Sequence, residues 1–258
     1  MVEKIEEDLW TLGGKKMHSR FILGSGKYSP ELIRAAVEEA GAEMLTLAVR
    51  RANTVNDNIL AFIPEDVLLL PNTSGARTAE EALRIARMAR ELGCGDFIKV
   101  EVVRDTKYLL PDNAETIRAT ALLVREGFTV LPYMYPDLTA ARDLAAAGAA
   151  AVMPLAAPIG SNRGLLTKDF LQILLDEIEL PVIVDAGIGR PSEAAAVMEM
   201  GATAVMLNTA IATAGDIRRM ARAFRLAIEG GREAFLSGLG QLGRTARASS
   251  PQIDFLTE

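Results

Sequence analysis

Two charged residues interrupt an apolar stretch near the middle of the chain, Phe97–Val103 (FIKVEVV). The stretch is rich in β-branched residues and is typical of a short buried strand. Because side chains alternate along a strand, Lys99 and Glu101 share one face and the aliphatic residues between them form the other. One interpretation is a structural ion pair in a core, since unpaired buried charges are costly. The other is a lysine with a lowered pKa that acts as a Schiff-base nucleophile, and the clustering of perturbed groups at active sites favours it.

A second stretch, residues 182–189 (VIVDAGIG), ends an apolar run with a carboxylate and a glycine loop. Ile183 and Asp185 share a face, so we expect Asp185 to point toward the same interior as Lys99. Gly187 and Gly189 would leave backbone N–H groups open to an anion, and a helix beginning at Pro191 would add positive potential. A plain turn that needs glycine for its geometry is the alternative.

A repeated order of helix, glycine and apolar strand indicates the architecture that positions these side chains. Each glycine is expected to end a helix in the left-handed conformation, and a strand follows within a few residues. The glycines are Gly41, Gly93, Gly127, Gly148 and Gly201, and the expected strands lie at 21–23, 44–49, 67–70, 97–103, 128–132, 150–155, 181–185 and 204–207.

Alternation of strands and helices with near-continuous apolar strands predicts a parallel sheet. Eight such units favour a single α/β domain over 1–258, a closed (β/α)8 TIM barrel. A short hairpin over 8–20 would precede it, and a tail over 246–258 with freedom to move would follow. A doubly wound open sheet is the alternative, but Ser29 stands where its glycine fingerprint requires a third glycine.

Composition narrows the function classes. The 258 residues carry a formal net charge of −6, which argues against a general nucleic-acid surface. Cys94 is the one cysteine and His18 the one histidine, so we expect no disulfide, no structural metal and no Ser-His-Asp triad. His18 is expected at the surface and Cys94 as a small buried residue. The start of the sequence lacks signal-peptide character and we see no membrane span, so we expect a cytoplasmic protein.

Polar residues follow several of the expected strands, at the end where barrels of this kind place their active sites. Asn208 and Thr209, after the eighth strand, are placed to complete a phosphate site with the glycine loop. Arg50, Arg51 and Arg163 are equally compatible with anion ligands and with solvated loop charges, so their roles stay open.

With these residues placed, the sequence resembles the thiazole synthases of thiamin (vitamin B1) biosynthesis, the ThiG family. The resemblance extends over nearly the whole chain, and the order and spacing of its motifs make a chance match implausible. The segments that carry it are LGSGKY (23–28), AVRR (48–51), LPNTSG (70–75), TAEEA (78–82), FIKVEV (97–102), LLPD (109–112), EGFTVLPY (126–133), AAVMPLAAPIGS (150–161), VDAGIGRPSEAA (184–195), VMLNTAIA (205–212) and ASSP (248–251).

The resemblance implies a sulfur-transferring enzyme without a cofactor. Its substrates would be 1-deoxy-D-xylulose 5-phosphate, dehydroglycine (2-iminoacetate) and a small sulfur carrier protein with a C-terminal thiocarboxylate. Lys99 matches the lysine that forms an imine with the sugar phosphate, and Glu101 and Asp185 match an acid/base pair. The matching phosphosugar-binding positions are Gly160, Ala186, Gly187, Asn208 and Thr209. A homo-oligomer is also implied.

Two other functions fit part of the sequence. A class I aldolase acting on a phosphosugar would also use Lys99 and a phosphate loop, but it needs no partner protein. A non-catalytic barrel that binds a phosphosugar would not need the costly lysine–glutamate pair. The division of acid and base roles between Glu101 and Asp185 stays open.

Overall fold

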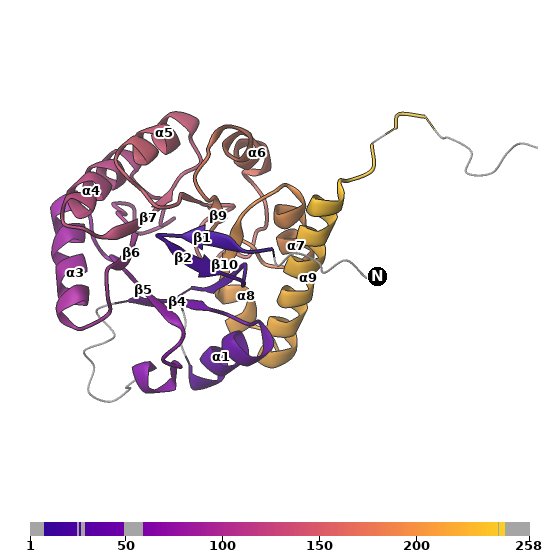
Figure 1. The fold of residues 1–258 in the computed structure, drawn as a ribbon, viewed down its shortest axis with the longest axis horizontal. Coiled ribbons are helices and arrows are strands. Elements are labelled where there is room, and N and C mark those ends of the chain that lie inside the picture. The colour runs from indigo at the N-terminus through magenta and orange to yellow at the C-terminus, as the bar shows by residue number, and fades with distance from the viewer. Residues whose placement is uncertain (1–7, 25, 27–28, 49–58, 242, 246–258) are drawn as a thin grey trace, which may run out of the picture.

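The computed structural model describes residues 8–24, 26, 29–48, 59–241 and 243–245. Eight parallel strands form a barrel with helices around it, and the N-terminal hairpin lies across one end of the barrel (Figure 1). Arg50, Arg51 and the expected tail over 246–258 lie outside the described residues.

All eight expected strands are present, and their order around the barrel is β8-β7-β6-β5-β4-β3-β10-β9. Isolated bridges between Val152 and Val182 and between Leu155 and Asp185 join β8 to β9 and close the barrel. The closed barrel confirms the predicted fold class and excludes the open sheet. The strands are β3 (Phe21–Leu23), β4 (Met44–Ala48), β5 (Leu68–Asn72), β6 (Phe97–Val100), β7 (Thr129–Met134), β8 (Met153–Pro154), β9 (Ile183–Val184) and β10 (Ala204–Leu207).

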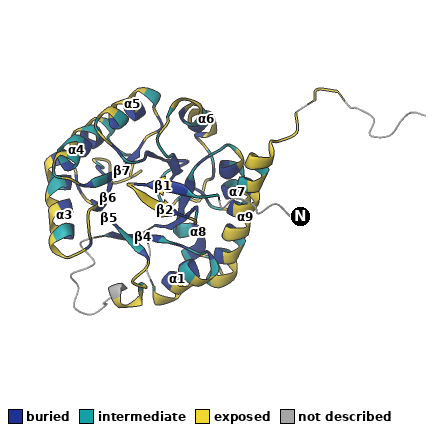
Figure 2. Ribbon diagram, in the orientation of Figure 1, coloured by how far each residue is buried: buried dark blue, intermediate teal, exposed yellow. Residues whose placement is uncertain are grey.

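The helices pack outside the barrel with their inner faces buried and their outer faces exposed (Figure 2). All five helix-ending glycines have the expected positive φ, between 68° and 98°. The helical segments are α1 (Pro30–Arg34), its π-helical continuation η1 (Ala35–Glu39), the 3-10 turn η2 (Ile59–Phe62), α3 (Ala79–Glu91), α4 (Asn113–Arg125), α5 (Leu138–Ala146), α6 (Lys168–Glu177), α7 (Pro191–Glu199), α8 (Thr209–Ala212) and α9 (Ile217–Ser237).

The hairpin of β1 (Trp10–Leu12) and β2 (Lys15–Met17) plugs the N-terminal end of the barrel. Its buried side chains join one apolar cluster with interior residues of the barrel strands. At its tip, a Cβ on Gly13 would meet the Thr129 side chain at 2.5 Å, so the tip lies against the first residues of β6 and β7. The plug leaves the carboxyl ends of the strands as the open end of the barrel.

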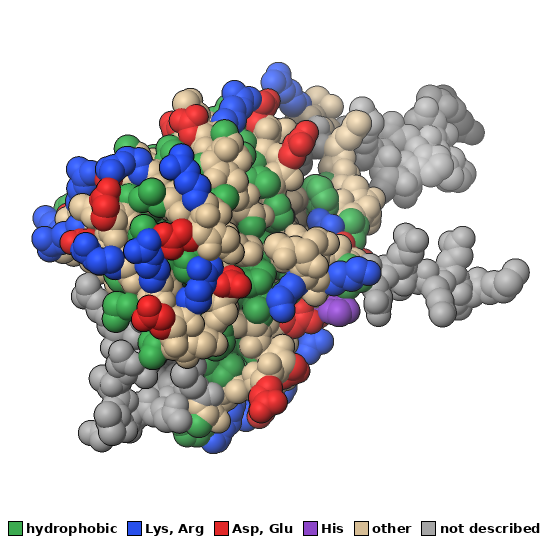
Figure 3. Space-filling model, turned by 60° about the vertical axis from the view of Figure 1, so that its left-hand side comes forward, with side chains coloured by type: hydrophobic (Ala, Val, Ile, Leu, Met, Phe, Trp, Pro, Cys, Tyr) green, Lys and Arg blue, Asp and Glu red, His purple; other side chains and the backbone are tan. Residues whose placement is uncertain are grey.

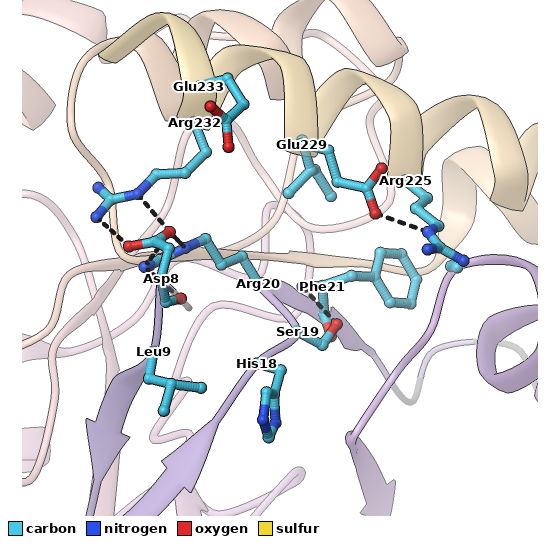
Figure 4. A pocket seen from close by; sticks show the side chains of 12 residues that line it. Asp8, Leu9, His18, Ser19, Arg20, Phe21, Arg225, Glu229, Arg232 and Glu233 are labelled. Carbon is cyan, nitrogen blue, oxygen red and sulfur yellow. Dashed lines mark hydrogen bonds and ion pairs between the residues drawn. The ribbon is translucent and has the colours of Figure 1, made fainter. Parts of the chain in front are cut away.

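A partly buried charge network ties the segment just before the hairpin to the last helix (Figure 4). The Asp8 carboxylate accepts hydrogen bonds from Arg20 at 2.9 Å and from Arg232 of α9 at 2.8 and 2.9 Å. Arg20 also donates to the Thr203 carbonyl at 2.6 Å. These arginines line a cavity of about 260 Å³, but their donors are directed at Asp8 and the backbone.

Elsewhere the surface carries charges of both signs. Figure 3 shows basic and acidic side chains interspersed on the face that carries α3 and α4. Arg118 of α4 pairs with Glu80 of α3 at 2.7 Å, and Arg87 of α3 pairs with Glu126. His18 is exposed, as expected, and contacts Glu43 at 3.1 Å at the plugged end.

Adjacent glycines in α9 give a test of how closely this helix packs. Gly231 is buried against α7, where an added Cβ would meet the Ala195 carbonyl oxygen at 2.4 Å, whereas Gly230 is exposed with open space around it. We expect Gly231→Ala to lower the free energy of unfolding by about 1–3 kcal/mol through overpacking. Gly230→Ala should raise it by up to about 1 kcal/mol through helix propensity. Urea unfolding measures both, and equal effects would contradict the packing of α9 on α7.

Candidate active site

Three buried charged residues meet inside the barrel near its open end. The Lys99 ammonium lies 2.9 Å from a Glu101 carboxylate oxygen and 2.6 Å from Asp185 Oδ2. The three residues are only 5–8% exposed. The strand pattern had placed Lys99 and Glu101 on one face with Asp185 directed toward them, and the structure brings all three together. We call this group the ion triad.

Pairing along the sheet fixes where each member stands. Lys99 lies in β6 between Asn72 of β5 and Leu131 of β7. Asp185 directly follows β9, which is separated from β6 by β7 and β8. The lysine side chain therefore spans the barrel interior to reach Asp185, and the triad can form only if the barrel is closed.

Glu101 lies just past the end of β6, which is shorter than the sequence had suggested. At Glu101, the side chain of Thr73 makes the hydrogen bonds that a neighbouring strand would otherwise make. The Thr73 hydroxyl donates to the Glu101 carbonyl at 2.9 Å and accepts from the Glu101 N–H at 2.8 Å. This bracing role of Thr73 was missed because nothing in the sequence marks the end of β6 before Glu101.

Electrostatics within the triad differ from the expectation. Burial lowers the pKa of Lys99, but the carboxylates of Asp185 and Glu101 together raise it well above the ordinary value. The predicted lowering was therefore wrong in direction for this state, because it took account of burial but not of the attraction between the ammonium and two carboxylates. Burial also raises the pKa of Asp185, although Lys99 opposes that shift. The Lys99 shift therefore follows from two carboxylates around one ammonium, and the Asp185 shift follows from burial.

The loop after Asp185 has strained and crowded geometry. Ala186 has φ 57° and its N–H donates to the Asp185 carboxylate, while Gly187 has φ 83°. A Cβ on Gly187 would lie 2.4 Å from the Ala157 backbone nitrogen, so this position requires glycine for both conformation and space. The loop therefore positions Asp185 and also lines the open, carboxyl end of the barrel, which we call the mouth.

The structure contradicts one part of the anion site predicted at the start of α7, the availability of the Gly189 N–H group. The N–H of Gly189 donates to the Glu193 carboxylate at 2.8 Å, and the N–H of Arg190 donates to it at 3.0 Å. Glu193 therefore already occupies the donors that the sequence had assigned to an anion. Its reach back to Gly189 was not evident because a glutamate in a first helical turn usually signals only a cap.

Asn208 and Thr209 lie at the opposite side of the mouth from β5 and β6. The Asn208 side-chain nitrogen donates to the Gly24 carbonyl at 2.6 Å, which ties β10 to the end of β3. Thr209 begins α8 directly after Asn208. The Asn208 side chain thus has a structural hydrogen bond in addition to its place at the mouth.

A cavity of about 690 Å³ opens above the triad. Its lining includes every catalytic and phosphosugar-binding position expected from the sequence, so the structure brings these candidates into one space. Arg163 is not among the residues that line it. The lining residues include Gly24, Gly26, Ser74, Gly75, Arg77, Lys99, Glu101, Leu109, Gly160, Asn162, Asp185, Ala186, Gly187, Asn208 and Thr209. Arg77 was not predicted from the sequence, although it lies two residues after the end of the LPNTSG segment.

A family model described as "Thiazole biosynthesis protein ThiG" matches residues 11–251. The chain belongs to the ThiG family. Thiazole synthase from Clostridium beijerinckii is 66% identical over 98% of this chain and 100% of its own length. Thiazole synthase from Fusobacterium nucleatum is 64% identical over 97% and 98%. This ThiG-family protein is accordingly an enzyme, a thiazole synthase of thiamin biosynthesis.

Solved structures agree with this assignment. The Amycolatopsis orientalis BexX/CysO complex includes a chain that matches 91% of this ThiG-family protein and 98% of its own length, with a TM-score of 0.82 and 33% identity. A 3-hexulose-6-phosphate synthase matches with a TM-score of 0.57 and 18% identity, which supports the barrel fold alone.

The described residues contain no group of three or more His, Cys, Asp or Glu side chains arranged to hold a metal ion. Within the same residues, no helix of this ThiG-family protein has the length and apolar character needed to cross a membrane. Cys94 is buried before β6, away from the open end, and burial raises the pKa of its thiol. It is thus the small buried residue that the sequence predicted.

The ion triad makes stability pH-dependent once its cation is removed. Lys99→Met leaves two carboxylates in a dry interior, and we expect it to lower the free energy of unfolding by about 3–5 kcal/mol near pH 8. Unpaired buried carboxyls have raised pKa values in the folded state. Because the folded variant then binds more protons than the unfolded chain, its stability falls as pH rises and the loss should be smaller near pH 5.

Urea unfolding of Lys99→Met and wild type at the two pH values measures this difference. Lys16→Met, at an exposed position of strand β2, serves as the control and should change stability little at either pH. An equal loss for Lys99→Met at pH 5 and pH 8 would contradict buried, unpaired carboxylates.

Proposed function

We propose that Lys99 forms an imine with the ketone of 1-deoxy-D-xylulose 5-phosphate during thiazole synthesis. The observation that carries this proposal is a buried lysine at the floor of an open cavity with two carboxylates within 2.9 Å. The amine attacks the ketone carbon and the ketone oxygen leaves as water. No cofactor is required, because the lysine itself supplies the covalent link.

The lysine must lose a proton before it can attack. Its raised pKa keeps it as an ammonium in the free enzyme, so an external base at neutral pH would be a poor acceptor. Asp185 lies 2.6 Å away and burial raises its own pKa, which makes it the better acceptor. Proton transfer within the pair gives a neutral amine and a neutral acid without moving net charge into the dry interior.

The carboxylates then have a second task. A protonated imine makes the neighbouring carbon acidic, and Glu101 and Asp185 approach it from different strands. Two carboxyl groups allow protons to be moved at different carbons as the carbonyl migrates along the sugar. Sulfur then attacks, water leaves, and condensation with dehydroglycine closes the thiazole ring.

The substrate phosphate is assigned to the side of the mouth away from β5 and β6. Gly160, Gly187 and Thr209 line the cavity there, and this side contains small residues that allow close approach of an anion. Because Glu193 holds the N–H groups of Gly189 and Arg190, the phosphate is assigned to the loop residues before them. Ala186 and Asn208 border the same space.

Sulfur is assigned to a small carrier protein with a C-terminal thiocarboxylate. Support comes from the similar chain in the BexX/CysO complex and from the open mouth, which leaves room for an extended tail beside the sugar phosphate. We further assign the enzyme to the cytoplasm and expect it to work as a homo-oligomer.

Replacing the proposed nucleophile tests the covalent step. We expect Lys99→Ala to abolish the adduct that borohydride traps with 1-deoxy-D-xylulose 5-phosphate, because no other described lysine lines the cavity. Intact mass and peptide mapping measure the adduct. Lys168→Ala, at the start of α6, should trap as well as wild type. A trapped adduct on Lys99→Ala would show that the nucleophile is another residue.

Replacing the opposite carboxylate separates adduct formation from turnover. We expect Asp185→Asn to retain the trapped adduct, because loss of one carboxylate lowers the pKa of Lys99 and leaves Glu101 to accept its proton. Turnover should fall by about 100-fold or more, the usual contribution of a positioned acid or base. Thiazole phosphate formation with carrier and dehydroglycine measures turnover. Full turnover in this variant would remove Asp185 from the mechanism, and a retro-aldol product without a sulfur donor would favour an aldolase.

A further inference from the structure

Tyr133 carries a buried hydroxyl that the mechanism above does not use. It lies in β7, is 0% exposed, and its hydroxyl has no hydrogen-bond partner among the described residues. Leaving a buried hydroxyl unpaired costs about 1–3 kcal/mol, and such a group in a native structure calls for an explanation. A phenylalanine would fill the same space without that cost.

The ring stands beside the ion triad. Tyr133 alternates with Leu131, which belongs to the apolar cluster inside the barrel, so its side chain also points inward. The Lys99 nitrogen lies 5.3 Å from the centroid of its ring, within range of a cation–π contact. Tyr133 is not among the residues that line the cavity, so its ring is covered by protein where it approaches Lys99.

The charged groups facing Tyr133 are those of the triad. Burial raises the pKa of the phenol, and the Asp185 and Glu101 carboxylates raise it further, so the phenol stays protonated and serves as a donor. The neighbouring strand β8 and its flanks, residues 150–157, contain no titratable side chain. The hydroxyl therefore has carboxylates nearby and a proton to donate.

Imine formation changes the number of donors in the triad. An ammonium has three N–H bonds, and Lys99 uses them on Glu101 and Asp185. A protonated imine has one N–H, because two of the nitrogen valences now go to the substrate carbon. Only one carboxylate can then keep its contact with Lys99, and the other loses its donor in a dry site.

We propose that Tyr133 is a positioning residue whose hydroxyl donates a hydrogen bond to the carboxylate that Lys99 releases when it becomes an imine. This inference rests on the proposed imine at Lys99. In the free enzyme the hydroxyl has no partner among the described residues, and the ammonium contacts both carboxylates. After imine formation, it orients the released carboxylate for proton transfer and stabilises its charged form, which keeps that group a competent base.

Tyr133→Phe is the direct test. The borohydride adduct should form as in wild type, while kcat falls about 10-fold or more and KM for the sugar phosphate stays within about two-fold. Loss of a hydrogen bond to the charged carboxylate raises its pKa, so the acidic limb of the kcat profile should move to higher pH. The melting temperature should not fall, because the variant removes an unpaired hydroxyl.

Thr116→Val is a matched control. The Thr116 hydroxyl in α4 is also buried without a partner among the described residues, but it lies outside the cavity. This variant should leave kcat and its pH profile unchanged. Site-specific 3-fluorotyrosine at position 133 gives a second variant of nearly the same shape, and its stronger donor should move the acidic limb to lower pH.

The outcomes separate this inference from the proposed function. No trapped adduct on wild type would overturn the imine itself. An adduct on both wild type and Tyr133→Phe, with equal kcat and pH profiles, would overturn the role of Tyr133 alone. Loss of the adduct in Tyr133→Phe would also overturn it, because the hydroxyl would then act before the imine exists.

Discussion

The structure of the active site depends on one ammonium shared by two buried carboxylates. Each of the three charges would be costly alone in a dry interior, so each depends on the placement of the other two. Lys99 and Asp185 come from strands that are not neighbours, and their 2.6 Å contact requires the full circuit of the barrel. The ion triad that carries out the chemistry can therefore form only in the closed barrel.

Barrel closure and the ion triad meet at the same residue. The Asp185 N–H donates to the Pro154 carbonyl at 2.9 Å, and its own carbonyl accepts from the Ala156 N–H at 3.0 Å. These hydrogen bonds form the bridge between β8 and β9, where the regular strands are only two residues long. The backbone of Asp185 closes the barrel while its side chain pairs with Lys99. At the other end, the hairpin plug leaves only one end of the barrel open.

Much of this arrangement could be predicted from the sequence, because it depends on local periodicity. Strand alternation placed Lys99 and Glu101 on one face, and helix-ending glycines marked where five of the strands begin. What could not be predicted depends on contacts between distant segments. The pKa of Lys99 rises because Asp185 faces it across the barrel. Likewise, only the folded loop shows that Glu193 takes the Gly189 N–H and that Asn208 bonds to Gly24.

A raised lysine pKa is compatible with a nucleophilic role because the pKa of its partner is raised as well. The two carboxylates hold a proton on Lys99, and burial favours a proton on Asp185. Moving the proton across 2.6 Å changes which atom carries it but not the net charge of the site. The free energy that this transfer requires is therefore smaller than the Lys99 pKa alone suggests. A lysine with a lowered pKa would be neutral in the resting site and would leave both carboxylates without their ionic partner.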